Sequence, residues 1–289
     1  MDLSIIIVNW NVRDLLKRLL ESIFNYTQGI EFEVIVVDNN SGDGSIEMVR
    51  ENFPQVKIIA NQENLGFAKA NNQGLKIALG KFVLFMNPDM ELKENSFKKL
   101  ADFMEQNPGI GISTCQLTYP DGKVQPIIKN NPTFCSQLLI ILKLHHFFMP
   151  ECLKKYLAKD FDYLKQSEVK QIMGAFVFAR KEVMEKLKGW CEDYFAWWED
   201  IDLCYSAQKA DIKIFYIPIT KVIHHEGKSF EQELSYKKQK RFNRGMMIYF
   251  RKYKPFWQYL VICALNPISL LLALISQILK IKPKSQSKI

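Results

Sequence analysis

The chain has 289 residues, 48% of them hydrophobic and 24% charged, with a formal net charge of +8; it can bury a sizeable core, which excludes disorder as its main state. The basic charge belongs to the tail, because the residues from Leu234 onward hold 12 Lys+Arg and no Asp or Glu, whereas residues 1–233 hold 27 basic and 31 acidic groups. This distribution indicates an anionic membrane surface as a partner and argues against nucleic acid, since binding a phosphate backbone needs a basic stripe on the folded body.

The first 90 residues alternate between strand and helix patterns. A continuous apolar, β-branched run at 3–8 is typical of a strand buried on both faces, and apolar residues on one face from Leu15 to Ile23 indicate a helix. The alternation continues with a strand, a helix, a strand, a helix and a strand at Glu33–Val37, Ile46–Phe53, Val56–Ala60, Phe67–Leu79 and Phe82–Met86. This order predicts an α/β fold with a mostly parallel sheet flanked by helices, and a ligand crevice outside the carboxyl ends of the strands.

Residues 118–168 are less regular. Their apolar patch at Phe134–Met149, interrupted by Lys143 and the His145-His146 pair, suggests an insertion over one end of the sheet. From Lys170 the order resumes, with a strand at QIMGAFVFA, a helix at Asp200–Lys209 and strands at Lys213–Ile217 and Lys221–His224.

The tail differs in kind, because Phe256–Leu279 carries no charge and has basic residues on both sides. A helix needs roughly 20 residues to cross a hydrocarbon core about 30 Å thick, so this segment could span a membrane. Asn266-Pro267 in its middle fits two half-length helices lying in the interface equally well, and a helix packed on the domain is a third reading. We predict a folded domain at 1–230 and a basic, apolar, membrane-associating helical region at 231–289.

The cysteines and the N-terminus bear on the compartment. The cysteines are scattered without a C-x-x-C pair, which fits neither a disulfide framework nor a zinc cluster, so we expect reduced thiols. The start, MDLSIIIVNW, lacks the basic n-region and the longer apolar h-region of a signal peptide, which predicts residence in the cytoplasm. The six cysteines are Cys115, Cys135, Cys152, Cys191, Cys204 and Cys263.

Polar side chains follow several of the predicted strands. Asp38 could accept hydrogen bonds from a ribose hydroxyl or a base N–H, although its surroundings also read as a plain turn. Gly66 could let the backbone approach a diphosphate or simply begin a helix. Asp89, in Asn87-Pro88-Asp89, could hold Mg²⁺ or Mn²⁺ and so stabilise charge on a diphosphate, or it could be an ordinary turn residue.

The segment Trp197-Trp198-Glu199-Asp200-Ile201-Asp202-Leu203 is more specific. Three carboxylates repel one another and the tryptophans lower the local dielectric, so we expect a perturbed pKa and a carboxylate able to act as a general base. The alternative is an acidic first turn favoured by the helix dipole, which explains the acids but not the tryptophans. A weaker signal is His224-His225, where one histidine could bind a metal or contact a diphosphate.

Taken in order, these motifs resemble glycosyltransferase family 2, with the GT-A fold, and within it the rhamnosyltransferase-like branch that builds bacterial cell-surface polysaccharides. The resemblance extends over residues 3–229, and 118–168 match least. The matching segments are SIIIVNWN, VIVVDNNSGDGS, NQENLGFAKANNQG, FVLFMNPDM, MGAFVFARKEV, GWCEDYFAWWEDIDLCYSAQKA and VIHHEGKS.

The resemblance implies roles for the residues on the donor side. Asp38 would contact the donor nucleoside, and Gly66, Lys69 and Asn71 would border the nucleotide pocket. Asp89 would be the surviving carboxylate of a D-x-D metal motif, and His224 would lie near the metal and the diphosphate. The first D-x-D position is Asn87, which offers an oxygen without a charge.

The resemblance also implies the reaction. Asp200 would be the catalytic base of a single, inverting displacement, with Glu199 and Asp202 orienting the base or the acceptor. The donor would be a nucleotide-diphosphate sugar, with rhamnose from a thymidine donor as the family-level expectation, and the acceptor a glycan or lipid-linked saccharide at the cytoplasmic face of a membrane. Two other readings stay open: a nucleotidyltransferase, and a carbohydrate-binding or scaffold protein that kept the fold without catalysis.

Overall fold

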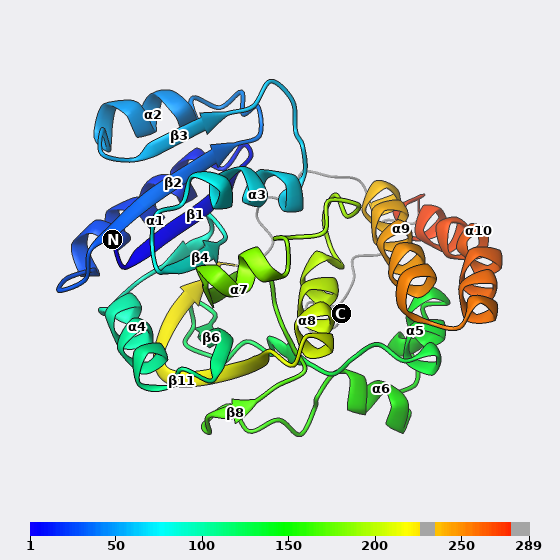
Figure 1. Ribbon diagram of the computed structural model, residues 1–289. Coiled ribbons are helices and arrows are strands. Elements are labelled where there is room, and N and C mark those ends of the chain that lie inside the picture. Colours follow the sequence, from blue (N-terminus) through cyan, green and yellow to red (C-terminus); the bar gives the residue numbers. More distant parts are fainter. Residues whose placement is uncertain (226–234, 279–289) are drawn as a thin grey trace.

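The computed structural model describes residues 1–225 and 235–278. Its centre is a nine-stranded sheet with the order β3-β2-β1-β4-β10-β6-β11-β5, in which β8 pairs with β11 (Figure 1). The strands of this sheet are β1 (Leu3–Asn9), β2 (Phe32–Asp38), β3 (Lys57–Ala60), β4 (Phe82–Met86), β5 (Met90–Glu91), β6 (Ile110–Thr118), β8 (Ser167–Glu168), β10 (Phe176–Arg180) and β11 (Lys213–His224). A small second sheet pairs β7 (Ile128–Lys129) with β9 (Gln171–Ile172).

The sheet is largely parallel, as the strand and helix alternation predicts. Strands β3, β2, β1 and β4 are parallel, and β6 is parallel to β11. Antiparallel β10 joins these two groups, pairing with β4 on one side and β6 on the other. The predicted mixed α/β class is therefore confirmed.

Helices lie on both faces of the sheet and at one end of the molecule. The α-helices are α1 (Arg13–Tyr26), α2 (Ser45–Asn52), α3 (Phe67–Ile77), α4 (Ser96–Gln106), α5 (Phe134–Ile141), α6 (Glu151–Tyr156), α7 (Lys181–Lys186), α8 (Glu199–Lys209), α9 (Ser235–Tyr253) and α10 (Phe256–Ile278). Gly74 of α3 packs directly on Ile6, whereas Leu16 of α1 and Val49 of α2 line a small space against Val36. Because Ile6 is paired with Ile35, Val36 points to the opposite face, so α3 and the α1/α2 pair lie on different faces.

The last predicted strands form one element. The segments expected at Lys213–Ile217 and Lys221–His224 belong to the single strand β11, whose register against β6 shifts between Ile217 and Lys221. Pro218 lies in that shift, where a residue without an N–H costs no ladder hydrogen bond. The interruption between the two predicted strands is therefore a bulge within β11 rather than the end of a strand.

The irregular middle segment and the tail build a second hydrophobic core. It is separate from the core around the sheet and contains residues from α5, α6, the segment before α8, α9 and α10. Figure 1 shows α5, α9 and α10 gathered at one end of the molecule, far from β3 and α2. The predicted boundary at residue 230 lies outside the described residues.

The uncharged part of the tail forms the apolar helix α10, with Pro267 inside it. Its ribbon changes direction between the orange first half and the red second half in Figure 1, as a proline within a helix favours. By length and composition this helix could cross a membrane, and only 17% of its most apolar window is buried. Ile262, Ser269 and Ala273 face the protein, whereas most of its other large apolar side chains are exposed.

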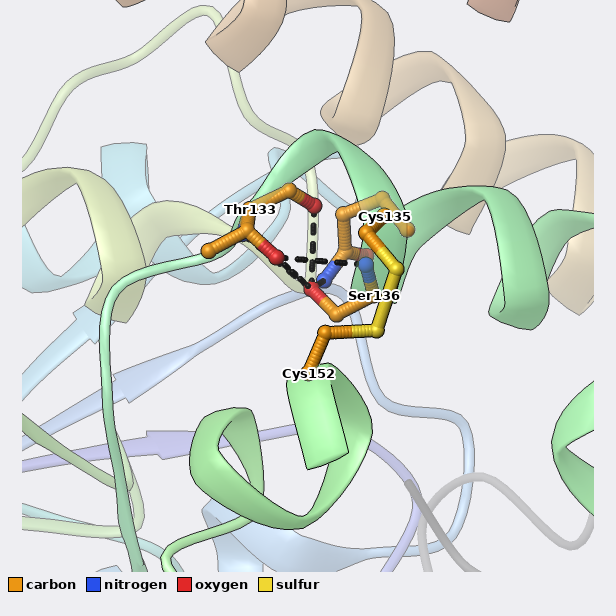
Figure 2. The surroundings of a disulfide bond; sticks show 5 residues. Thr133, Cys135, Ser136 and Cys152 are labelled. Atoms are coloured by element: carbon orange, nitrogen blue, oxygen red, sulfur yellow. Dashed lines mark hydrogen bonds between the residues drawn. A yellow bond between two sulfur atoms is a disulfide. The ribbon is translucent and has the colours of Figure 1, made fainter. Parts of the chain in front are cut away.

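The prediction that all six cysteines are reduced thiols is wrong for one pair. Cys135 and Cys152 form a disulfide that joins the first turn of α5 to α6, beside the Thr133–Ser136 capping box that begins α5 (Figure 2). Their Cα atoms lie 6.3 Å apart, a separation that a disulfide bridges. Sequence spacing misses such a pair, because the fold of the intervening segment alone brings the two helices together. Cys115, Cys191, Cys204 and Cys263 are free.

Candidate active site

The carboxyl ends of neighbouring strands bring the first set of predicted residues to one edge. Asn9 of β1 is paired with Asp38 of β2, and on the other side of β1 Ile7 is paired with Met86, so Asn87 follows at the same edge. Asp38 is fully buried: one carboxylate oxygen accepts from Asn9 Nδ2 at 2.7 Å and the other from the Ser41 N–H at 2.8 Å. Asp38 thus shapes the loop at this edge, and its contact with a nucleoside stays a prediction.

A second path links the same edge to the segment before α8. Asn39 Nδ2 donates to the Gly66 carbonyl, and the Phe67 N–H donates to the Phe195 carbonyl at 2.7 Å. Gly66 has φ +82°, and a Cβ there would lie 2.3 Å from the Phe195 oxygen. Only glycine allows this approach, so Gly66 lets the segment from Phe195 lie against α3, and its place at the nucleotide pocket stays a prediction.

The other donor-side residues have different exposures. Lys69 is exposed in the first turns of α3, whereas Asn71 is buried and its Nδ2 donates to the Phe67 carbonyl within the helix. Asn87 is half-buried at the end of β4. The structure thus leaves Lys69 and Asn87 open to a ligand and gives Asn71 a structural contact.

Glu199 and Asp200, at the start of α8, are linked to this edge through the residues just before β10. The Asn87 N–H donates to the Ala175 carbonyl at 3.0 Å, and the N–H of the preceding Gly174 donates to Asp200 Oδ2 at 3.0 Å. Asp200 therefore lies next to the strand end that carries Asn87, although 113 positions separate them in the printed numbering. Gly174 has no side chain, and a Cβ there would lie 3.1 Å from the Asp200 Cβ.

Two residues with a strained backbone lie directly before the Glu199–Asp200 pair and orient it. Trp197 and Trp198 have φ +66° and +73°, a left-handed conformation that bulky side chains rarely adopt. Residues in such conformations persist where the surroundings hold them, and they concentrate at functional sites. Trp198 is 1% exposed and packs on Gly245 of α9, where a Cβ would lie 2.6 Å from Trp198 Cδ1. The left-handed turn ends at Glu199, the first residue of α8.

The two adjacent carboxyl groups differ in their surroundings. Burial, followed by the negative charge of Asp200, raises the pKa of Glu199 well above its usual range, and Glu199 Oε2 has no hydrogen-bond partner among the described residues. Burial also raises the pKa of Asp200, but the Gly174 and Ile201 N–H groups and the positive charge of Lys129 oppose the shift. The negative charge of the pair therefore belongs on Asp200, and Glu199 is held neutral.

Asp202 serves a different purpose from its neighbours. Its carboxylate accepts from Tyr194 Oη at 3.1 Å and from Lys252 Nζ of α9 at 2.9 Å. Asp202 and Lys252 line a cavity of about 350 Å³ that also contacts Trp190 and Cys191, and neither Glu199 nor Asp200 lines it. The structure thus separates Asp202 from the carboxylates with which the sequence groups it and makes it a link between α8 and α9.

Asp89 and His224 form a buried pair on the far side of Asn87. His224 Nε2 lies 3.3 Å from Asp89 Oδ1, both side chains are almost fully buried, and neither atom has a hydrogen-bond partner among the described residues. Gln125 fixes the ring: its Nε2 donates to the His224 carbonyl at 2.8 Å, so its Oε1, 2.9 Å from His224 Nδ1, must accept from that nitrogen.

The tautomer of His224 decides what Asp89 faces. When His224 is neutral and donates through Nδ1, its Nε2 carries a lone pair, and this acceptor faces the Asp89 carboxylate. Two buried acceptors at this separation fit a cation between them, and a histidine oriented through its other nitrogen is the usual arrangement at metal sites. Within residues 1–225 and 235–278 no group of three His, Cys, Asp or Glu side chains stands ready to hold a metal, so the pair would supply part of the ligands.

Sequence reasoning did not single out three residues that support the site. Gln125 orients His224, Gly174 holds Asp200, and Lys129 places a positive charge near Asp200. Gln125 and Lys129 come from the irregular segment, where no pattern indicates a function, and each meets its partner only through the fold. Glu226–Ser229, the end of the last matching motif, lies outside the described residues.

Comparison with known proteins supports the family resemblance that the sequence motifs indicate. The model of the family described as Glycosyl transferase family 2 matches residues 4–187. The chain is 29% identical over 164 residues to the minor teichoic acid biosynthesis protein GgaB of Bacillus subtilis, covering 55% of this chain and 18% of that protein. It is 26% identical over 243 residues to the N-acetylglucosaminyl-diphospho-decaprenol L-rhamnosyltransferase of Mycobacterium tuberculosis, covering 78% and 77%. The chain thus spans under a fifth of GgaB.

Among solved structures, the mannosyltransferase PcManGT of Pyrobaculum calidifontis, in complex with GDP-Man and Mn²⁺, is similar with a TM-score of 0.57 and 18% identity, covering 95% of this chain and 73% of that chain. This likeness confirms the predicted GT-A fold. The family match covers more than half of the sequence and includes the strand ends that carry Asp38, Asn87 and Asp89. The chain therefore belongs to glycosyl transferase family 2.

Proposed function

We propose that this chain transfers a sugar from a nucleoside-diphosphate sugar to a hydroxyl of a glycan or lipid-linked saccharide, with inversion, in the synthesis of a cell-surface polysaccharide. The observation that carries the proposal is the asymmetric pair at the start of α8, in which Asp200 is half-buried and held by two backbone N–H groups, while burial and the charge of Asp200 raise the pKa of the buried Glu199. A carboxylate with a raised pKa next to the carboxyl end of a strand is suited to accept a proton.

The reaction follows from these positions. Asp200 accepts the proton of the acceptor hydroxyl, and the oxygen forms a bond to the anomeric carbon of the donor sugar. The bond between that carbon and the phosphate oxygen breaks on the opposite face, and the nucleoside diphosphate leaves with the electron pair. One displacement of this kind inverts the anomeric configuration.

The Asp89–His224 pair supports a divalent metal, Mg²⁺ or Mn²⁺, on the leaving-group side. Asp89 and His224 would hold the ion through the two acceptor atoms that face each other, with Asn87 offering a neutral oxygen nearby. When bound, the ion supplies positive charge that stabilises the departing diphosphate. PcManGT, which shares the fold, was solved with Mn²⁺ and a nucleotide sugar.

The proposed sugar is rhamnose from a thymidine-diphosphate donor, and the proposed place is the cytoplasmic face of a membrane. The first rests on the relative named as an L-rhamnosyltransferase, which this chain matches along most of both lengths. The second rests on the exposed apolar helix α10 and the basic residues around it. The diphospho-decaprenol in that relative's name supports a lipid-linked acceptor.

The test is the variant Asp200→Asn in the full chain, assayed by release of nucleoside diphosphate from a panel of nucleotide sugars with Mg²⁺ or Mn²⁺. Transfer should fall by about 10²–10⁴-fold because the base is lost, while calorimetric donor binding stays near that of the parent. Asp193→Asn removes an exposed carboxylate from the same segment and should leave both unchanged. Full turnover in Asp200→Asn would remove Asp200 from this role.

A further inference from the structure

The segment that joins α5 to α6 contains an exposed apolar stretch, residues 144–149, which we call the tip. Phe147, Phe148 and Met149 follow one another and are 78%, 61% and 41% exposed. The base of the loop is fixed: Ile141 and Leu153 are fully buried in the second core, and the Cys135–Cys152 disulfide joins α5 to α6 (Figure 2). Three adjacent apolar side chains are therefore held in water at a defined place, which soluble proteins rarely do without a partner.

The tip is uncharged at neutral pH in spite of its two histidines. Burial, together with the neighbouring His146 ring, lowers the pKa of His145 to about 4, and burial lowers the pKa of His146. The nearest cation, Lys143, is turned away from the tip and donates through Nζ to Gln239 of α9. An uncharged apolar tip can enter an apolar medium without the cost of burying a charge.

The helix that leads to the tip, α5, is joined to α9 and α10 at both of its ends. At one end of α5, the Phe134 ring packs on Trp257 with centroids 4.9 Å apart. At the other end, Lys143 holds Gln239, which donates to Asn243, which in turn donates to Asn266 in the middle of α10. The second half of α10 continues with exposed apolar side chains at Ile268, Leu271, Leu274, Ile275 and Ile278.

We propose that the tip is a second lipid-contacting element that enters the same anionic bilayer as α10. The charge around this surface selects that occupant: α9 contains seven Lys or Arg residues and no acid, and Lys237, Lys240, Arg244 and Arg251 are exposed. Basic residues beside an apolar face bind anionic lipid headgroups while the apolar side chains enter the acyl boundary.

Bilayer contacts at the tip and at α10, which lie far apart in sequence, fix the orientation of the protein on the membrane, whereas contact through a single helix does not. Trp198 and Tyr194, which lead into the Glu199–Asp200 pair, share the second core with Ile140 at the base of the tip. The tip therefore orients the crevice toward acceptors held in the bilayer, an inference that rests on the proposed membrane-bound acceptor.

The test is amide hydrogen exchange of the full chain with and without vesicles of equimolar phosphatidylcholine and phosphatidylglycerol. Vesicles should slow exchange in 144–149 by about tenfold or more, since burying three apolar side chains favours the bound state by at least that factor. The loop 162–166, which carries the 83% exposed Leu164, serves as internal reference and should not change.

Matched variants make the assignment specific. Phe147→Ser/Phe148→Ser/Met149→Ser should lose the protection of 144–149, whereas Leu79→Ser/Leu164→Ser/Ile219→Ser, which removes three exposed apolar side chains elsewhere, should keep it. Absence of lipid-dependent protection in the parent, or equal protection in both variants, overturns the proposal. The proposal is also overturned if the parent forms a dimer without lipid and only the tip substitutions dissociate it, because the tip then contacts a second copy of the chain. Donor binding, followed by calorimetry, tests the catalytic proposal independently of either result.

Discussion

At the scale of single residues, the chemistry depends on how two adjacent carboxyl groups are made different. Glu199 has an oxygen without a partner, whereas both oxygens of Asp200 accept a backbone N–H. Desolvation raises the pKa of both groups, but Asp200 receives more opposing hydrogen bonds than Glu199 and also the charge of Lys129, so Asp200 is the one that can cycle through its charged form. Neighbours in sequence thus acquire separate roles from the backbone that surrounds them.

The acid limb of the pH–rate profile should depend on Lys129. Asp200 must be deprotonated to accept a proton, so turnover falls as pH drops through its pKa, which burial has raised and Lys129 opposes. Lys129→Met removes the opposing charge, raises that pKa further and should move the acid limb toward higher pH with little change on the plateau. Lys123→Met, which removes an 80% exposed lysine from the same irregular segment, should leave the limb in place. An unmoved limb in Lys129→Met would contradict the proximity of the two charges.

Metal affinity should depend on Gln125, which contacts the proposed ligand His224 but would not itself bind the metal. Gln125→Leu removes the acceptor that fixes the His224 ring and should weaken Mn²⁺ binding by about 10–100-fold. Titration of Mn²⁺ by its electron paramagnetic resonance signal measures this directly. His224→Ala, which removes the ligand itself, should weaken binding at least as much, and parental affinity in both variants would exclude the Asp89–His224 pair as the metal site.

At the scale of elements, α9 works as a brace for the catalytic segment. Trp198 packs on Gly245, the Arg241 guanidinium lies 4.3 Å from the centre of the Phe195 ring, and Lys252 binds Asp202. The residues that hold the left-handed turn before Glu199 therefore come partly from the tail. This explains why a motif in the middle of the chain and a helix after residue 235 form one core.

Gly245→Ala tests that brace. In an exposed helix this change stabilises by about 1 kcal/mol, but here the added Cβ would meet Trp198 at 2.6 Å, so we expect a net loss of about 1–3 kcal/mol in the free energy of unfolding. Denaturant unfolding measures the loss, and turnover should fall with it because the turn before Glu199 shifts. Gly42→Ala, where nothing lies within 4 Å of the new Cβ, is the matched control. A Gly245→Ala variant about 1 kcal/mol more stable than the parent would show that Trp198 can move aside at no cost.

Local patterns predicted the elements whose shape depends on neighbours in sequence. The strand at Phe82–Met86 has the expected bounds, and the helix expected at Phe67–Leu79 is observed at Phe67–Ile77. What depends on distant contacts was missed: the disulfide, the union of two strands into β11, and the separation of Asp202 from Asp200. Three acids in four residues look alike in sequence, and only the contact with Lys252, fifty positions later, distinguishes Asp202 from the other two.

At the scale of the whole molecule, charge and apolar surface are divided between the two ends. The acidic body carries the proposed catalytic crevice, while the cations and the exposed apolar side chains gather on α9, α10 and the tip. Truncating the tail would not separate these functions, because Ile262 of α10 is fully buried in the second core beside Trp198. Point changes on the exposed face of α10 keep that core and remove only the surface.

We therefore expect Leu271→Ser/Leu274→Ser/Ile275→Ser to move the full chain from the membrane fraction to the soluble fraction. The three side chains are 56%, 39% and 42% exposed, so their loss should cost little stability but weaken lipid partition by at least tenfold, at about 25 cal/mol per Å² of apolar surface. Raising the salt concentration should weaken binding of the parent to anionic vesicles only in part, because salt screens the cations and leaves the apolar contribution. If the variant stays in the membrane fraction at high salt, α10 is not the anchor; if the parent leaves it completely, the attachment is purely electrostatic and the apolar face of α10 needs a protein partner instead.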